Sequence, residues 1–90
     1  MLLAIDIGNT NVVCGLFEGS TLRGHWRMAT ESRRTDNEYG ILLLNLLQNA
    51  GFTPDQITGC VLSSVVPALT ATFDCVVQEH FHRTAVIVGP

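Results

Sequence analysis

The sequence contains no lysine, and its five basic residues are all arginines. A Walker-type phosphate loop needs a lysine that reaches the β- and γ-phosphates, and a Schiff-base enzyme needs one as its nucleophile. Neither class fits these 90 residues. The net charge of −3 also argues against a general nucleic-acid-binding surface, which requires an excess of positive charge.

Cysteines are few and odd in number. Cys14, Cys60 and Cys75 are widely spaced, and each lies in an apolar segment. A zinc site would need closer pairs. We therefore expect three buried, reduced thiols that pack as small apolar side chains.

Long apolar runs are absent as well: none approaches the length of about 18 residues typical of a membrane-spanning helix. Met1 begins a strand-like pattern without a basic leader, so no signal peptide is predicted. These absences predict a cytoplasmic protein with no membrane partner. The sequence then describes one small domain, in which a hydrophobic fraction of 47% is enough for a thin core.

The beginning of the sequence predicts two strands joined by a polar turn. Met1–Ile5 is a buried strand by its apolar pattern, and Val12–Phe17 is a second strand. Between them lie the carboxylate of Asp6, then Gly8 and three small polar residues, 9–11. A glycine lets the backbone approach an anion closely, and side-chain amides and hydroxyls add donors. The turn therefore favours a phosphate site, with Asp6 holding Mg²⁺ directly or through water.

A plain β-hairpin is the alternative interpretation of the same residues. Asn and Gly are common in turns, and Asp often accepts a hydrogen bond from a nearby N–H. Two observations favour the phosphate site. Asp6 directly follows an apolar strand, where an unpaired charge is costly. Asn9, Thr10 and Asn11 also supply more polar groups than a two-residue turn needs.

A third strand and a helix follow. Thr21–Ala29 alternates loosely, and its parity slips at Gly24, which predicts a strand with a bulge. Thr35 and Glu38 form a capping box that begins a helix over Asp36–Ala50, and the next residue, a glycine, ends it.

The predicted helix 36–50 is apolar around most of its circumference. We expect Leu43 and Leu46 to face the sheet in the core. The polar stripe is so narrow that the helix should be covered on more than one side. The sheet and a neighbouring helix are the simpler cover. A partner subunit or a further domain, in contact with Ile41 and Leu42, is the alternative.

The remaining pattern completes an α/β fold. Gly59–Leu62 predicts a strand, Pro67 begins a second helix, and Thr84–Val88 predicts a final strand. The order β-β-β-α-β-α-β predicts a mixed five-stranded sheet with helices over it. This order is typical of the ribonuclease-H-like fold of actin, Hsp70 and sugar kinases, in which the first hairpin cradles nucleotide phosphates.

Three other polar groups are weaker candidates. Ser63-Ser64 lacks the frame of a nucleophile, and the proline that follows explains the pair as a strand-to-helix turn. His80 and His82, two residues apart, do not share a helix face, so core or solvated histidines are expected rather than a metal site. Arg33-Arg34 fits a solvated loop better than a phosphate contact.

Five segments together resemble the type III pantothenate kinases. They occur in the family's order and at its spacing, and they extend over essentially the whole chain. The segments are Asp6–Asn11, Trp26-Arg27, Thr35–Gly40, Ser63–Pro67 and Val88–Pro90. The sequence departs from the family's pattern at Asn37, where the family usually has Asp.

The resemblance implies an ATP-dependent phosphorylation of pantothenate to 4'-phosphopantothenate, the first step of coenzyme A biosynthesis. It implies a cytoplasmic homodimer that needs Mg²⁺ and a monovalent cation, K⁺ or NH₄⁺. The family's phosphate segment maps onto Asp6, Ile7, Gly8, Asn9, Thr10, Asn11, Val12 and Val13, with Asp6 serving the metal. Gly89 and Pro90 match the beginning of the loop that meets pantothenate.

The resemblance also implies parts of the site beyond Pro90: a catalytic Asp, a second phosphate loop and an adenine pocket. We therefore expect residues 1–90 to be the N-terminal nucleotide-phosphate-binding domain of a longer chain, without its second domain. Two alternatives stay open. One is a non-kinase regulatory homologue of the Bvg accessory factor type on the same scaffold. The other is an actin-like nucleotide-binding module, which would lack the segments at 35–40 and 63–67.

Overall fold

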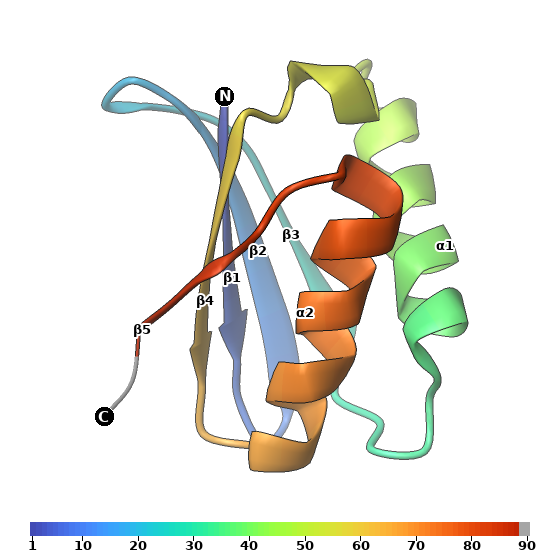
Figure 1. The fold of residues 1–90 in the computed structure, drawn as a ribbon. Helices are drawn as coiled ribbons and strands as arrows, with labels where there is room; N and C mark the ends of the chain where they lie inside the picture. Colours follow the sequence, from blue (N-terminus) through green and yellow to red (C-terminus); the bar gives the residue numbers. More distant parts are fainter. Residues whose placement is uncertain (89–90) are drawn as a thin grey trace.

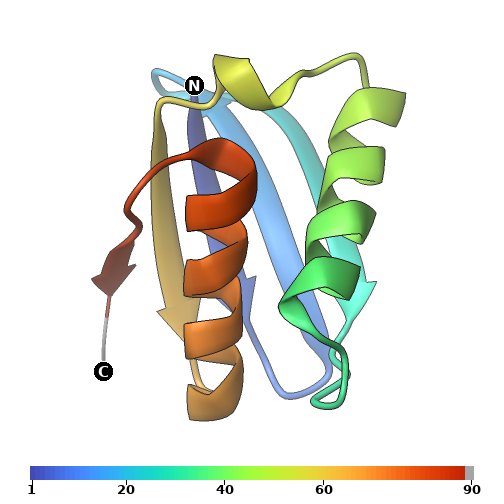
Figure 2. The same cartoon turned by 45° about the vertical axis from the view of Figure 1, so that its right-hand side comes forward.

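Five strands form one mixed sheet, and both helices pack against the same face of it (Figures 1 and 2). The computed structural model describes residues 1–88. Along the chain the elements are β1 (Leu2–Ile7), β2 (Asn11–Glu18), β3 (Thr21–Ala29), α1 (Asp36–Asn49), the 3₁₀ turn η1 (Pro54–Gln56), β4 (Gly59–Ser64), α2 (Pro67–Phe81) and β5 (Val86–Val88). The predicted order of strands and helices is confirmed.

The central strand is β1, since the order across the sheet is β3-β2-β1-β4-β5. It pairs antiparallel with β2 and parallel with β4. Alternate residues of β1 point to opposite faces, so Leu3, Ile5 and Ile7 are buried under the helices. The opposite face carries no helix within residues 1–88, and we call it the open face.

The predicted strand boundaries need correction at the functional end. β1 does not end before Asp6 but continues to Ile7, and β4 continues to Ser64. The extended ends of β1 and β4 pair with each other, since Asp6 and Ile7 lie opposite Ser63 and Ser64, and β1 pairs over the same residues with β2. The last strand begins at Val86 rather than at Thr84. The bulge is confirmed: the register between β2 and β3 shifts so that Leu16 pairs with Gly24 and Phe17 with Leu22.

Two of the three cysteines are core residues. Burial raises the pKa of the Cys14 thiol to about 12 and that of the Cys60 thiol to about 11. Cys75 is exposed, so its predicted burial is wrong. The buried face of α2 includes Phe73 and Val76, and Cys75 lies between these two positions on the outward side.

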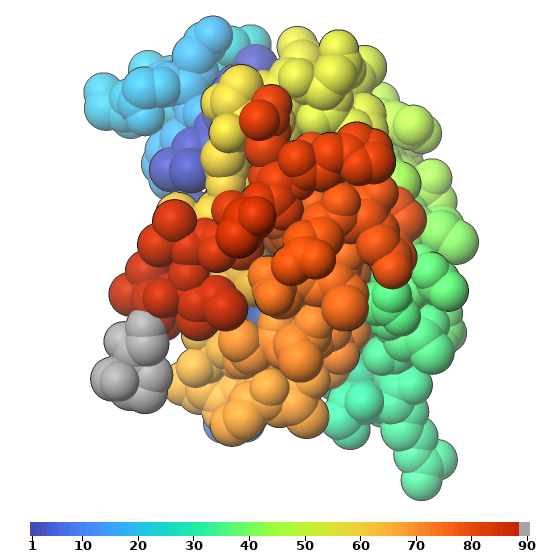
Figure 3. Space-filling model, in the orientation of Figure 1, coloured from blue at the N-terminus to red at the C-terminus, as the bar shows by residue number. Residues whose placement is uncertain are grey.

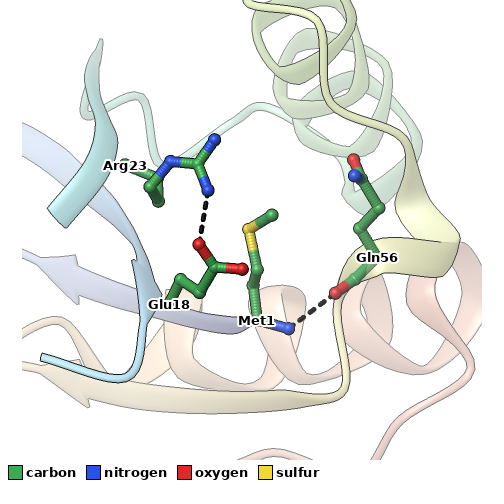
Figure 4. Close-up of polar contacts among 4 residues, drawn as sticks. All are labelled: Met1, Glu18, Arg23 and Gln56. Atoms are coloured by element: carbon green, nitrogen blue, oxygen red, sulfur yellow. Dashed lines mark hydrogen bonds and ion pairs between the residues drawn. The ribbon is translucent and has the colours of Figure 1, made fainter. Parts of the chain in front are cut away.

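The end of the sheet remote from the β1–β2 turn is closed by polar contacts (Figure 4). The Met1 amino group donates to the carbonyl oxygen of Gln56 at 2.7 Å. Beside it, the Arg23 guanidinium and the Glu18 carboxylate form an ion pair at 2.5 Å. Neither contact involves a candidate site residue. Within residues 1–88 neither helix is long and apolar enough to cross a membrane.

The capping box of α1 is present as predicted. The Thr35 hydroxyl oxygen accepts from the Glu38 N–H at 3.2 Å, and the Thr35 N–H donates to the Glu38 carboxylate at 3.0 Å. The bond from the Thr35 backbone, followed by that from its hydroxyl, lowers the pKa of Glu38. At the other end, Gly51 adopts a φ of 89°, which favours glycine, and the helix stops.

The buried face of α1 includes Leu43 and Leu47, whereas Leu43 and Leu46 were predicted. Leu43 is fully buried, as expected, but Leu46 is only partly buried and Leu47 is fully buried. Ile41 and Leu42 are 58% and 37% exposed, on the side of the helix away from the sheet. The sheet and α2 are therefore the cover of α1 within residues 1–88, and these two exposed side chains stay candidates for a partner surface.

These burial values predict unequal effects of truncation along α1. Leu43→Ala should lower the free energy of unfolding by about 2–5 kcal/mol, because it opens a cavity in the core. Leu46→Ala should lower it by clearly less, and Ile41→Ala by no more than about 0.5 kcal/mol. Urea denaturation measures all three. Equal losses for Leu43→Ala and Leu46→Ala would mean that the helix face is assigned wrongly.

The contact between the two helices depends on a glycine. Gly40 of α1 lies against the imidazole of His80 in α2, and a Cβ at this position would overlap the ring. The Nε2 atom of His80 is buried and has no hydrogen-bond partner among the described residues. The two helices can therefore approach closely only where α1 has no side chain.

This contact predicts a change of sign in a double-mutant cycle. In the wild-type background, Gly40→Ala should destabilise the protein by about 1–3 kcal/mol, through overpacking against His80. In a His80→Ala background the same substitution should stabilise it by up to about 1 kcal/mol, the helix propensity that alanine gains over glycine. Thermal or urea denaturation of the four proteins measures both effects. A stabilising Gly40→Ala in the wild-type background would contradict the contact.

Candidate functional site

Three loops gather at one end of the sheet. The β1–β2 turn, the loop from β3 to α1 and the loop from β4 to α2 all lie at the lower end in Figure 1. The carboxyl ends of β1 and β4 and the amino ends of both helices meet there. In the space-filling view the loop before α1, in blue-green, projects from this end (Figure 3). The predicted phosphate segment is therefore at an edge where several backbone ends converge.

Four of the five carbonyl oxygens at residues 7–11 accept hydrogen bonds from the protein, and that of Asn9 accepts none within residues 1–88. The Ile7 oxygen accepts from the Val65 N–H at 3.0 Å, and the Asn11 oxygen accepts from the Gly8 N–H at 2.9 Å. Thr30 supplies two more donors. Its hydroxyl donates to the Gly8 oxygen at 2.7 Å, and its N–H donates to the Thr10 oxygen at 2.9 Å.

Unlike most of these carbonyl oxygens, two N–H groups of the turn, those of Asn9 and Thr10, have no hydrogen-bond partner within residues 1–88. Both residues are exposed. Backbone N–H groups without a protein acceptor, on an exposed turn, carry partial positive charge that can attract an anion such as phosphate. The turn can therefore bind an anion through main-chain atoms.

Gly8 contributes space to this turn rather than a donor. Its N–H is used inside the turn, and a Cβ on it would lie 3.1 Å from the Asn11 oxygen, a very close contact. Ile7 and Val12 are fully buried, so only their main-chain atoms are available to a ligand. Asn11 is half-buried and Val13 is 41% exposed. Two further predicted positions, Gly89 and Pro90, lie outside the described residues.

The argument from burial for Asp6 is wrong. Asp6 is exposed on the open face, one position before the end of β1, so its charge is not costly there. The sequence placed Asp6 just after a buried strand because the predicted strand ended at Ile5, two residues before the observed end of β1 at Ile7. Within residues 1–88 its carboxylate forms no ion pair or hydrogen bond with another side chain.

Asp6 lies at one end of a groove on the open face. The groove has a volume of about 320 Å³. Ala4 and Gly15 are paired across β1 and β2 and make its low centre, since neither has a bulky side chain. Asp6 and its neighbour on β4, Ser63, stand at the end nearer the turn. The volume is in the range of small-ligand sites, and most of the lining is apolar.

The donor set around Asp6 fits a magnesium ion that is shared with a ligand. No group of three or more His, Cys, Asp or Glu in the described part of the chain is placed to hold a metal. A structural metal centre is therefore not built there. Mg²⁺ commonly takes one or two carboxylates, keeps several waters and completes its shell with substrate phosphates. One exposed carboxylate close to the predicted phosphate-binding turn is compatible with that arrangement.

The weaker candidates have structural explanations. The Ser64 hydroxyl donates to the Val66 oxygen and accepts from the Val66 N–H, both at 3.0 Å, so it shapes the turn before α2 as predicted. The Arg34 guanidinium lies 5.1 Å from the centre of the Tyr39 ring. Arg34 therefore packs the loop before α1 against Tyr39 of that helix.

Thr30, the residue after the third predicted strand, was not identified as a candidate from the sequence. The register could have identified it. Asn11 of β2 pairs with Ala29 of β3, so the residue after Ala29, which is Thr30, must lie opposite Thr10. A hydroxyl at that place reaches the turn.

Known proteins match this chain over nearly its whole length. A family model described as "Type III pantothenate kinase" matches residues 2–90. A type III pantothenate kinase of Anaeromyxobacter dehalogenans (strain 2CP-C) is 48% identical over 90 residues, which are 100% of this chain and 35% of that protein. Another, from Rhodospirillum centenum, is 49% identical over 89 residues, 99% of this chain and 34% of that protein. The chain thus spans about a third of the length of the curated relatives it matches.

Two solved structures share the fold at low sequence identity. A ROK hexokinase from Thermus thermophilus matches 98% of this chain and 34% of its own, with a TM-score of 0.68 and 14% identity. A putative N-acetylglucosamine kinase from Porphyromonas gingivalis matches 99% of this chain and 34% of its own, with a TM-score of 0.69 and 17% identity. These likenesses concern the fold alone, and they confirm the predicted sugar-kinase type of α/β domain.

Proposed function

Since the chain belongs to the family of type III pantothenate kinases, we propose that the protein transfers the γ-phosphoryl group of ATP to pantothenate. The product is 4'-phosphopantothenate, and the reaction is the first step of coenzyme A biosynthesis. The observation that carries this proposal is the β1–β2 turn. Most of its carbonyl groups accept hydrogen bonds from the protein, and the N–H groups of Asn9 and Thr10 have no acceptor within residues 1–88.

The turn and Asp6 have separate tasks in this proposal. The N–H groups of Asn9 and Thr10 bind phosphate oxygens of ATP and hold them in position. Asp6 holds Mg²⁺ beside them, directly or through water. The metal, when bound, neutralises charge on the phosphates. Positioning and charge stabilisation are most of what phosphoryl transfer requires from a protein, because little covalent chemistry falls to its side chains.

Other parts of the proposal rest on the family. We place the catalytic base, the second phosphate loop and the adenine pocket beyond Pro90, and the first contact with pantothenate at Gly89 and Pro90. The relatives' greater length supports this division. A monovalent cation, a cytoplasmic location and a homodimer are also proposed. Ile41 and Leu42 are the candidates for the dimer surface, because they are large apolar side chains exposed on α1.

The activity itself is the first test. Purified protein of the relatives' length, mixed with ATP, Mg²⁺, K⁺ and labelled pantothenate, should form phosphopantothenate. The 90-residue chain alone should not, because one phosphate clamp and one carboxylate cannot align both reactants. Turnover by the short chain within tenfold of the long one would refute the division of the site. ATP binding without product in the long protein would favour a regulatory homologue.

Asp6→Asn should abolish kinase activity and leave stability unchanged. The loss of charge removes the metal anchor, which supplies several kcal/mol of transition-state stabilisation. The fold should not respond, because Asp6 is exposed. Asp55→Asn is the matched control: it removes an exposed carboxylate from η1, away from the β1–β2 turn, and should be fully active. Wild-type turnover of Asp6→Asn at saturating Mg²⁺ would contradict the assignment.

A further inference from the structure

We propose that Thr30 is a positioning residue, and that its hydroxyl fixes the orientation in which the β1–β2 turn presents its amides to a nucleotide phosphate. This inference rests on the proposed function, and it assigns a role to a residue outside the phosphate segment itself. Thr30 follows the last residue of β3 and is separated by 22 positions from Gly8, whose oxygen it contacts.

Two bonds from one residue hold both sides of the turn. The Thr30 hydroxyl reaches the Gly8 oxygen at 2.7 Å, a short and well-formed O–H···O bond. The Thr30 N–H reaches the Thr10 oxygen at 2.9 Å. The two acceptors flank Asn9, so the peptide groups before and after the exposed tip are both tied to β3 through a single residue.

The hydroxyl bond controls a donor that it does not touch. The Gly8 carbonyl and the Asn9 N–H belong to one peptide group, which is planar and trans, so they point in opposite directions. When Thr30 holds the Gly8 oxygen on the protein side, the Asn9 N–H must point away from Thr30. That N–H is one of the two turn amides without an acceptor within residues 1–88. Rotation of this peptide would turn a carbonyl oxygen, rather than an N–H, toward the phosphate.

The side chain can be tested apart from the backbone. Any residue except proline can donate the backbone bond to Thr10, whereas the bond to Gly8 needs a side-chain donor of suitable reach, here the hydroxyl. Thr30→Val keeps the shape and the backbone donor and removes the hydroxyl. Thr30→Ser restores the hydroxyl. Thr30→Ala is a second hydroxyl-free variant, in case the valine packs badly in this half-buried position.

A matched control exists at the other end of the sheet. The Thr58 hydroxyl also donates to a backbone carbonyl, that of Met1, at 3.3 Å. Thr58→Val therefore removes a similar bond far from the turn. If the effect of Thr30 is specific to the turn, this variant should leave nucleotide binding unchanged, whatever it does to the melting temperature.

The experiment measures the dissociation constant of ATP with Mg²⁺ by calorimetry, and the KM values of ATP and pantothenate, in the intact protein. Thr30→Val and Thr30→Ala should weaken ATP binding and raise its KM about tenfold, the equivalent of one hydrogen bond. The KM of pantothenate should stay unchanged, and Thr30→Ser should bind ATP within about twofold of wild type. Thr58→Val should bind ATP as wild type does.

Two results would overturn the proposal. One is wild-type ATP affinity in folded Thr30→Val and Thr30→Ala. The other is a Thr30→Ser protein as weak as Thr30→Val, which would show that shape rather than the hydroxyl matters. If the wild-type protein binds ATP but leaves pantothenate unchanged, the proposed substrate fails. The affinity ratios then still decide the role of Thr30.

Discussion

The alternating burial of β1 is the constraint on which the rest of the structure depends. β1 is hydrogen-bonded on both sides, to β2 and to β4, so its register cannot slip without breaking two ladders. Leu3, Ile5 and Ile7 enter the core. Asp6 must then face the open side, and the turn after Ile7 must begin at the edge where β4 also ends. The position of the candidate site is thus a consequence of core packing.

In the β1–β2 turn, most carbonyl oxygens are hydrogen-bonded to the protein, whereas among the described residues the N–H groups at the tip are not. Thr30 and Val65 donate to carbonyl oxygens of the turn, while the N–H groups of Asn9 and Thr10 have no acceptor within residues 1–88. Binding by main-chain amides needs no lysine, and the sequence has none. Hydrogen bonds from Thr30 and Val65 restrain the turn, so in our proposal little ordering is required when phosphate binds.

Local signals in the sequence predicted most of the fold. The capping box at Thr35, the proline that begins α2 and the period of the apolar residues each have a short-range physical cause, and all are confirmed. The errors concern features that depend on distant partners. Asp6 lies inside β1 because β2 and β4 both pair beside it, and Cys75 is exposed because α2 turns another face to the sheet. Thr30 became visible only from the pairing of β2 with β3.

The central claim is that the tip of the β1–β2 turn binds phosphate through main-chain N–H groups. Amide NMR spectra of the ¹⁵N-labelled intact protein, titrated with ATP and Mg²⁺, test it directly. The account predicts that the Asn9 and Thr10 amide resonances shift most and that their hydrogen exchange slows. Gly19 and Ser20, in the exposed β2–β3 turn, should stay unchanged. Saturable ATP binding without a change at Asn9 and Thr10 would contradict the account.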